Sequence, residues 1–299
     1  MFYQLKDRMR RLSFARTCRG VLDTPPVELD SSSGMVVLSQ LQHKDVLMFL
    51  LALKSFARRV RPRSVHVLDD GTLTADDRRK LAEHIPDLRL LRRADFRSAA
   101  CPVGGCWERL LAIADLVRDH YVIQLDSDTL TLGAIVEVRQ AVSESKAFII
   151  GTWDRQGFES MEERVQTAAK LAHGPGAHVQ VVAEANLDKL DGYASSRYVR
   201  GCAGFAGYAR GSFRRSFVEA TSTRMRSAIG AKWEEWGSEQ VMSNIVVASI
   251  ANAVVLPHPK YADCHKMRRD VTEFIHFIGS CRFDGDRYAR LGAEIVATL

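Results

Sequence analysis

Between Met35 and Leu125 the sequence alternates short apolar segments with longer amphipathic ones, and this alternation is its strongest constraint on the fold. Segments with strand character are "MVVLSQ", "SVHVLDD", "LRLL" and "YVIQL". Segments with helical spacing of apolar residues lie between them: "KDVLMFLLALKSFARRV", "TADDRRKLAEHI" and "CWERLLAIADLV". Strands that alternate with helices indicate parallel pairing with helices on the sheet faces. The sequence therefore predicts an α/β fold with a doubly wound, mostly parallel sheet.

The last of these strands ends in two carboxylates, in the stretch "YVIQLDSDTLTLG". Asp126 and Asp128 are two residues apart, so on an extended backbone they point the same way. Like charges held together repel unless a cation lies between them. Mg²⁺ and Mn²⁺ prefer oxygen ligands and leave positions open for phosphates. We expect a divalent-metal site at this strand end, where such sheets bind ligands; the alternative is two solvated loop acids.

Two other motif classes that use closely spaced aspartates fit less well. A calcium-binding loop of the form D-x-D-x-D-G is interrupted at Leu130 and Thr131. Phosphatases of the haloacid dehalogenase type have D-x-D-x-T/V near the start of the fold. Here Leu130 takes the fifth position, and three strand–helix units precede the motif.

The order of motifs along the chain resembles that of a GT-A-type glycosyltransferase. The relevant segments are the strand–helix units, "YVIQLDSDT", "GCAGFAGY", "GSEQVMSN" and "HFIG", which together cover roughly residues 35 to 285. The chain is most similar to the retaining family of glycogenin and the bacterial lipopolysaccharide galactosyl- and glucosyltransferases. The resemblance implies a GT-A-like fold with a smaller acceptor-side region in the C-terminal part.

The resemblance also implies roles for individual residues. In this family the DxD acids bind the manganese that holds the nucleotide diphosphate, which here implies Asp126 and Asp128. A late H-x-x-G-x-x-K segment supplies a third metal ligand and a phosphate-binding cation. In this sequence it reads His276, Gly279 and Arg282.

The family's Asp-Gln pair near the reacting sugar corresponds to Glu239 and Gln240, which are therefore the catalytic candidates. Ser238 is the expected N-cap of the helix that carries them. The sequence departs from the family at two places. Its Lys-Pro-Trp is Arg282-Phe283-Asp284, and its Asn-Ser-Gly turn is Cys202-Ala203-Gly204, which indicates altered sugar contacts around Gly204.

Further donor-binding candidates follow from their places in the predicted elements. Ser39 and Gln40 end the first strand, where such folds seat the nucleoside, and Asp70 would meet the base or ribose unless it only forms a turn. Arg109 opens a helix below the phosphates, with ion pairing to Glu108 or Asp115 as the alternative. Ser127, between the two metal-site acids, completes this set. Trp233 and Trp236 either stack on an acceptor sugar or cap the core.

Composition adds limits on location and partners. The net charge of +6 and isoelectric point of about 9.1 favour an anionic partner. The six cysteines form no CxxC pair, no secretory signal is visible, and the longest apolar run is too short to span a bilayer. We expect a cytoplasmic protein with free thiols. Its basic N-terminal arm could contact an anionic membrane, unless it is a solvated helix or packs on the body.

The expected organisation is a basic arm and linker over residues 1–34, then a single catalytic domain over 35–299. Residues 35–150 would form its nucleotide-binding half and 151–299 its acceptor and closing half. The predicted function is transfer of a sugar, with Mn²⁺ or Mg²⁺, from a UDP-linked donor to a glycan or lipid-linked acceptor, with retention. Nucleic acid is not an expected partner. The alternatives are a metal-dependent phosphohydrolase or nucleotidyltransferase, and an inactive sugar-nucleotide-binding protein.

Overall fold

The computed structural model describes every residue except 1, 153, 173, 175 and 280. The chain divides into two compact units. The first consists of Met1–Arg92, Ile123–Arg139 and His258–Leu299, and the second of Arg93–Val122 and Gln140–Pro257. The division at residue 150 into a nucleotide-binding and an acceptor half stays a prediction.

The first unit contains a parallel sheet and a small mixed one. Its helices are α1 (Phe2–Cys18), α2 (Val46–Ala57), α3 (Ala75–His84) and α10 (Arg287–Val296). Its strands are β1 (Met35–Leu41), β2 (Ser64–Asp69), β3 (Arg89–Arg92), most of β4 (Tyr121–Leu125), β5 (Thr129–Thr131), β11 (Tyr261–Asp263) and β12 (Phe274–His276). β2 pairs in parallel with both β1 and β3. β12 pairs in parallel with β11 and antiparallel with β5.

Local sequence explains the helices of this unit. α2 is apolar on nearly all sides, and almost every one of its residues is buried. α3 begins with a capping box in which Thr74 accepts from the backbone N–H of Asp77 and the Asp77 carboxylate accepts from that of Thr74. The expected cap at Thr74 is confirmed. Helix α5 (Val136–Ser143) starts in this unit and ends in the second.

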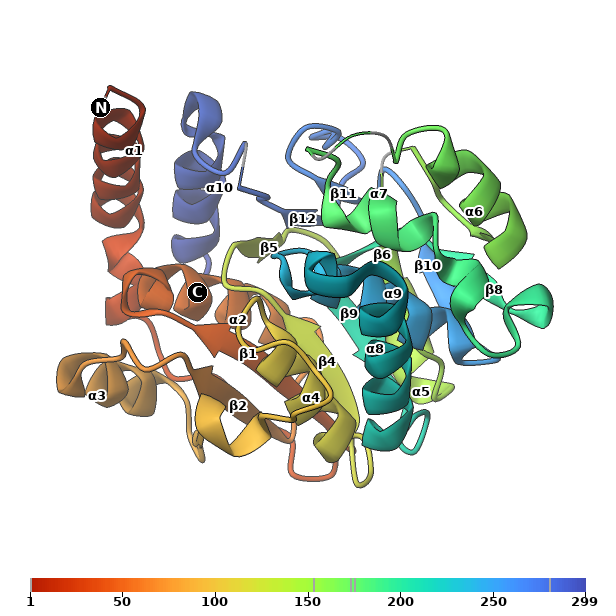
Figure 1. The fold of residues 1–299 in the computed structure, drawn as a ribbon. Coiled ribbons are helices and arrows are strands. Elements are labelled where there is room, and N and C mark those ends of the chain that lie inside the picture. The colour runs from red at the N-terminus through yellow and green to blue at the C-terminus, as the bar shows by residue number, and fades with distance from the viewer. Residues whose placement is uncertain (1, 153, 173, 175, 280) are drawn as a thin grey trace. The chain divides into compact units, whose positions relative to one another are not determined.

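The basic N-terminal arm is a helix packed on the body of the first unit. α1 lies beside α10 (Figure 1), with the ring of Phe14 4.3 Å from that of Tyr288. Phe14 and Cys18 are buried, and Arg10 pairs with Asp284 at 2.7 Å. Of the interpretations open from the sequence, packing on the body is the one that the structure shows.

The second unit combines an antiparallel strand with a parallel pair. Its helices are α4 (Trp107–Leu116), α6 (Met161–Ala169), α7 (Val179–Glu184), α8 (Arg215–Ile229) and α9 (Ser238–Ser249). Its strands are β6 (Phe148–Gly151), β7 (Phe158–Ser160), β8 (Arg197–Val199), β9 (Gly201–Tyr208) and β10 (Val254–Leu256). β6 pairs in parallel with β10 and antiparallel with β9, and β7 pairs antiparallel with β8. The expected α/β class with mostly parallel strands is confirmed.

Close packing explains two features of the second unit. A Cβ atom on Gly207 of β9 would lie 2.2 Å from the Phe148 ring, so only glycine fits there. The expected N-cap at Ser238 is wrong. Gly237, at φ 105°, precedes the first helical residue, and the Ser238 hydroxyl instead accepts a hydrogen bond from the Trp107 indole at 2.9 Å.

Candidate functional site

The turn between β4 and β5 in the first unit carries Asp126 and Asp128. The hydroxyl of Thr129 donates to the Asp126 carbonyl at 2.9 Å, which closes the turn. The N–H of Phe277 donates to the Asp128 carbonyl at 2.8 Å. β12 pairs with β5 so that His276 lies opposite Thr129. This pairing brings a histidine from far along the chain to the two acids.

The three side chains form a cluster that could hold one metal ion. His276 Nε2 lies 3.3 Å from an Asp128 oxygen and 3.9 Å from an Asp126 oxygen. One ligand atom from each residue lies within 4.8 Å of the others. Ligands on opposite sides of one Mg²⁺ or Mn²⁺ ion are about 4.2 Å apart, so small side-chain movements bring all three into bonding range. Two carboxylates and an imidazole therefore fit such an ion and leave further positions for a ligand.

Arg282 lies directly beside this cluster. Its guanidinium pairs with the other oxygen of Asp128 and donates through Nε to the Phe277 carbonyl at 3.2 Å. Burial would raise the pKa of Asp128, but the positive charges of His276 and Arg282 outweigh it and lower that pKa to about 2. Burial would lower the pKa of Arg282, and the carboxylates of Asp128 and Asp45 raise it. Asp128 is thus ionised at neutral pH.

Sequence reasoning missed two supports of this cluster. The Tyr288 hydroxyl donates to the Ser127 carbonyl at 3.3 Å, and its ring stacks on Phe277 at 4.1 Å. No local pattern marks Tyr288 as a neighbour of residues so distant in sequence. The second support is a disulfide between Cys264 and Cys281, so the expectation that all thiols are free is wrong for these two.

The nucleoside-site candidates lie at the ends of β1 and β2. Ser39 and Gln40 face Val67 and Leu68 of β2 in the strand register. Within the described part of the chain, Ser39 Oγ and Gln40 Oε1 are buried without a hydrogen-bond partner. The Asp70 carboxylate accepts from both the N–H and the hydroxyl of Thr72, at 2.9 and 2.7 Å, which is the turn expected as its alternative role.

The catalytic candidates lie on α9 of the second unit. Glu239 is buried, accepts from the Ser243 hydroxyl at 2.9 Å and lies 3.5 Å from the guanidinium of Arg109, which is also buried. The two partners expected for Arg109 are engaged elsewhere: Glu108 accepts from the Gly104 N–H, and Asp115 pairs with Arg215. A buried arginine thus neutralises Glu239.

Gln240 is fixed to the backbone of β9. Its Oε1 accepts from the Ala203 N–H at 2.8 Å, and its Nε2 donates to the Gly201 carbonyl at 2.8 Å and to Asn244 at 3.0 Å. Gly204, the other sugar-contact candidate, lies in the same strand. These bonds leave the Gln240 side chain little freedom to rotate.

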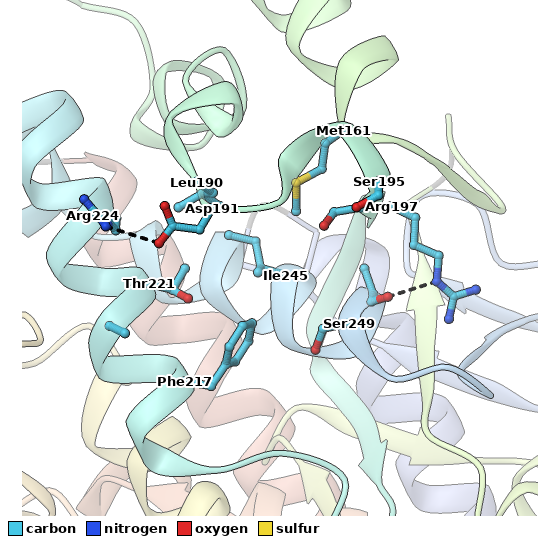
Figure 2. A pocket seen from close by; sticks show the side chains of 13 residues that line it. Met161, Leu190, Asp191, Ser195, Arg197, Phe217, Thr221, Arg224, Ile245 and Ser249 are labelled. Carbon is cyan, nitrogen blue, oxygen red and sulfur yellow. Dashed lines mark hydrogen bonds and ion pairs between the residues drawn. The ribbon is translucent and has the colours of Figure 1, made fainter.

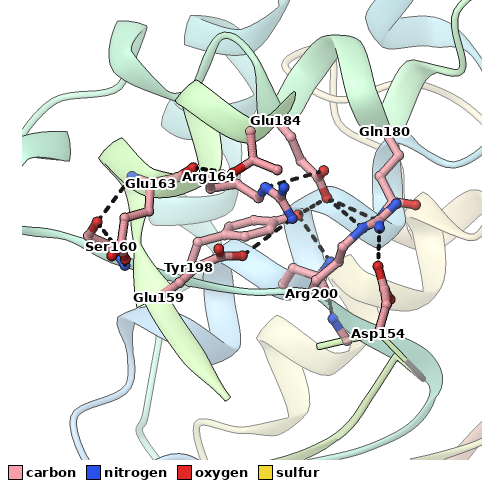
Figure 3. A network of polar contacts seen from close by, with 12 residues as sticks. Asp154, Glu159, Ser160, Glu163, Arg164, Gln180, Glu184, Tyr198 and Arg200 are labelled. Atoms are coloured by element: carbon pink, nitrogen blue, oxygen red, sulfur yellow. Dashed lines mark hydrogen bonds and ion pairs between the residues drawn. The ribbon is translucent and has the colours of Figure 1, made fainter. Parts of the chain in front are cut away.

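A buried polar network extends from Asn244. Asn244 donates to the Tyr198 hydroxyl, which donates to Glu184, each at 3.1 Å. Figure 3 shows Glu184 between the guanidinium groups of Arg164 and Arg200, 3.8 and 3.4 Å away. Burial raises the pKa of Glu184 against the opposing effect of both arginines. Sequence analysis missed this network, although Asn244, one helical turn after Gln240, was a detectable neighbour.

The two tryptophans before α9 differ in their surroundings. Trp233 is fully buried, donates to the Ser222 hydroxyl at 3.0 Å and packs edge-on against Trp107 at 5.5 Å. Trp236 is 76% exposed. Trp233 is therefore a core residue, and Trp236 lies on the surface.

The second unit also contains a cavity of about 450 Å³ (Figure 2). Met161, Leu190, Phe217 and Ile245 supply its apolar walls, and the ion pair of Asp191 and Arg224, at 3.2 Å, closes one side. Its volume is typical of a small-molecule site. The side chains predicted from the sequence to bind donor or metal do not line it.

Comparisons with known proteins find similar solved structures. The bifunctional glycosyltransferase WbbM matches with a TM-score of 0.48 and 14% identity, over 86% of this chain and 47% of WbbM, so the chain spans about half of that protein. The galactosyltransferase LgtC, solved with donor and acceptor sugar analogues, has a TM-score of 0.46, 12% identity and coverages of 89% and 96%. The mannosyltransferase Ktr4p from S. cerevisiae has a TM-score of 0.45, 10% identity and coverages of 95% and 89%. Neither a protein-family model nor a curated protein matches the sequence.

Proposed function

We propose that this protein is a metal-dependent glycosyltransferase that transfers a sugar from a nucleotide-sugar donor to an acceptor hydroxyl. The observation that carries the proposal is the cluster of Asp126, Asp128 and His276, with Arg282 beside it. Mn²⁺ or Mg²⁺ held by the first three residues would neutralise the charge that develops on a departing diphosphate.

Arg282 would bind the same diphosphate. In the structure its guanidinium pairs with Asp128. A metal ion that draws the Asp128 charge to itself would leave the guanidinium free to donate to phosphate oxygens. The planar fork of arginine suits phosphate as well as carboxylate. Such preorganised positive charge favours loss of the leaving group in the transition state.

The donor proposed is UDP-linked. Ser39 Oγ and Gln40 Oε1, which are buried without a described hydrogen-bond partner, would supply a hydroxyl and an amide oxygen for recognition of a nucleoside. Asp70 directly follows β2, the strand paired with β1, and would contact the base or ribose. Arg109, Ser127, Gly204 and Gly279 remain donor-binding proposals. Glu239 and Gln240 would stabilise the cationic anomeric carbon or position the acceptor.

The proposed acceptor is a glycan or a lipid-linked sugar, handled at the cytoplasmic face of a membrane. No helix in the described part of the chain is long and apolar enough to cross a bilayer. On α1, Met9 and Leu12 are more than 60% exposed and stand one turn apart among basic residues. This pattern suits peripheral contact with anionic lipid.

A Met9→Ser/Leu12→Ser variant is expected to lose most binding to anionic vesicles, because those side chains supply the apolar part of the contact. Co-sedimentation with phosphatidylserine vesicles measures this at low and physiological salt. Neutral phosphatidylcholine vesicles serve as the control. Failure of the wild-type protein to sediment with anionic vesicles would end the membrane part of the proposal.

Product analysis tests the proposed reaction. Incubation with a panel of nucleotide sugars, Mn²⁺ and simple glycosides should release a nucleoside diphosphate and form a new glycoside. Release of phosphate or pyrophosphate would favour the phosphohydrolase or nucleotidyltransferase alternative. Tight donor binding without any product would favour an inactive binding protein.

A Glu239→Gln variant is expected to lose about 10²–10³-fold in turnover, since it removes the carboxylate proposed to act on the reacting sugar and leaves the metal-site residues of the first unit unchanged. Ser249→Ala, at the far end of α9, is the matched control.

We expect retention at the anomeric carbon. A β-glycoside as the first product from an α-linked donor, seen by proton NMR, would contradict retention and make Glu239 the general base of an inverting enzyme.

A further inference from the structure

The disulfide between Cys264 and Cys281 adjoins the residues proposed to bind the diphosphate. Cys264 directly follows β11, and its N–H donates to the carbonyl of His276 at 3.1 Å. Its own carbonyl accepts from the Arg287 guanidinium at 2.7 Å. Cys281 is the residue immediately before Arg282. The bridge thus joins the end of β11, where Cys264 bonds to the His276 backbone, to the residue before Arg282, the proposed phosphate ligand.

Arg282 has contacts of its own besides the bridge. Its guanidinium pairs with Asp128 and donates through Nε to the Phe277 carbonyl at 3.2 Å. The N–H of Cys281 donates to the Ile278 carbonyl at 3.0 Å. In the proposed reaction the guanidinium leaves Asp128 for the diphosphate, so the ion pair no longer holds it. The disulfide directly before Arg282 is the covalent tie that remains.

We infer that Cys264 and Cys281 are a reversible thiol–disulfide modification site whose oxidised form holds Arg282 in place to bind a diphosphate. The inference rests on the proposed function, because it assigns Arg282 to the same ligand. A low-molecular-weight dithiol is the co-reactant. One of its thiolates attacks a bridge sulfur and forms a mixed disulfide; its second thiolate then displaces the protein sulfur. The bridge gains two electrons and two protons, and the dithiol becomes a cyclic disulfide.

Reduction would weaken diphosphate binding because the residues around Arg282 lose their covalent tie. No side chain proposed to bind the diphosphate is removed. The two acids, His276 and Arg282 all remain in the reduced protein. The segment around Arg282 must then be ordered when the ligand binds, and ordering a side chain and its loop lowers affinity. The expected loss is about tenfold.

Calorimetric titration of the full-length protein with UDP in the presence of Mg²⁺ tests the inference. The wild type is measured as purified and after treatment with dithiothreitol, with thiol titration to verify that two further cysteines become reactive. The oxidised form should bind about tenfold more tightly. The Cys264→Ser/Cys281→Ser variant should bind like the reduced wild type and should not respond to dithiothreitol. A Cys106→Ser variant, which removes an unbridged cysteine, should respond as the wild type does.

Three results would overturn the inference. Equal affinity in the two redox states, with two more thiols titrated, would overturn it alone. Loss of the far-ultraviolet circular dichroism signal on reduction would show that the bridge holds the whole unit rather than one segment. Absence of UDP binding in both states would overturn the proposed function and the inference together. If the double serine variant does not fold, the comparison of oxidised and reduced wild type decides.

Discussion

An Asp128→Asn variant is expected to bind UDP in the presence of Mn²⁺ at least about 100-fold more weakly than the wild type. Asp128 contacts both His276, 3.3 Å away, and Arg282, which pairs with its other oxygen. The substitution removes one of three proposed metal ligands and leaves the Arg282 guanidinium without its carboxylate partner. A loss of about 100-fold corresponds to about 2.7 kcal/mol, which is ordinary for a charged ligand at a buried site.

Calorimetry with and without Mn²⁺ measures this effect. The variant should show the same weak UDP affinity in both conditions, because the metal no longer contributes. Asp270→Asn is the matched control, since Asp270 belongs to the same unit but is exposed and pairs with nearby Arg268 at 3.3 Å. Metal-dependent UDP binding of wild-type strength in the Asp128→Asn variant would contradict the metal site.

A Phe14→Ala variant is expected to lower the free energy of unfolding by about 3–5 kcal/mol. Phe14 is only 2% exposed and contacts the rings of Tyr288 and Phe283, so its removal leaves a cavity between α1 and α10. The basic arm is thus a part of the core rather than an appendage. Urea denaturation followed by circular dichroism measures the change.

Leu12→Ala, two residues earlier on the same helix, is the control for Phe14. Leu12 is 61% exposed, so its truncation should change stability by no more than about 0.5 kcal/mol. Equal urea midpoints for Phe14→Ala and wild type would show that α1 does not contribute to the stability of the first unit.

Local features of the fold were accessible from the sequence because they depend on neighbouring residues. The periodicity of α2 and the capping box of α3 involve residues within one or two turns, and both predicted elements are confirmed. Asp126 and Asp128 stood out because they end an apolar strand. Ser238 is not the N-cap because Gly237 takes that position, and the Ser238 hydroxyl accepts from Trp107, a contact made through the tertiary structure.

The residues that make up the site were harder to predict where they come from segments far apart in the sequence. His276 and Arg282 were identified through spacing that resembles a known family, but their convergence on Asp128 comes from the pairing of β12 with β5. The disulfide and the support from Tyr288 arise from the same tertiary arrangement. Cysteine spacing alone does not determine pairing, since six cysteines allow 15 complete connectivities.

Anomalous diffraction at the manganese absorption edge is the most direct measurement of the metal site. Crystals grown with MnCl₂ and UDP should show one strong peak about 2.1–2.2 Å from oxygens of Asp126 and Asp128 and from Nε2 of His276. Diphosphate oxygens should complete its coordination, with the Arg282 guanidinium turned from Asp128 towards them. Bound UDP with no manganese peak at these three residues, or a peak elsewhere on the chain, would contradict the proposed metal-dependent transfer.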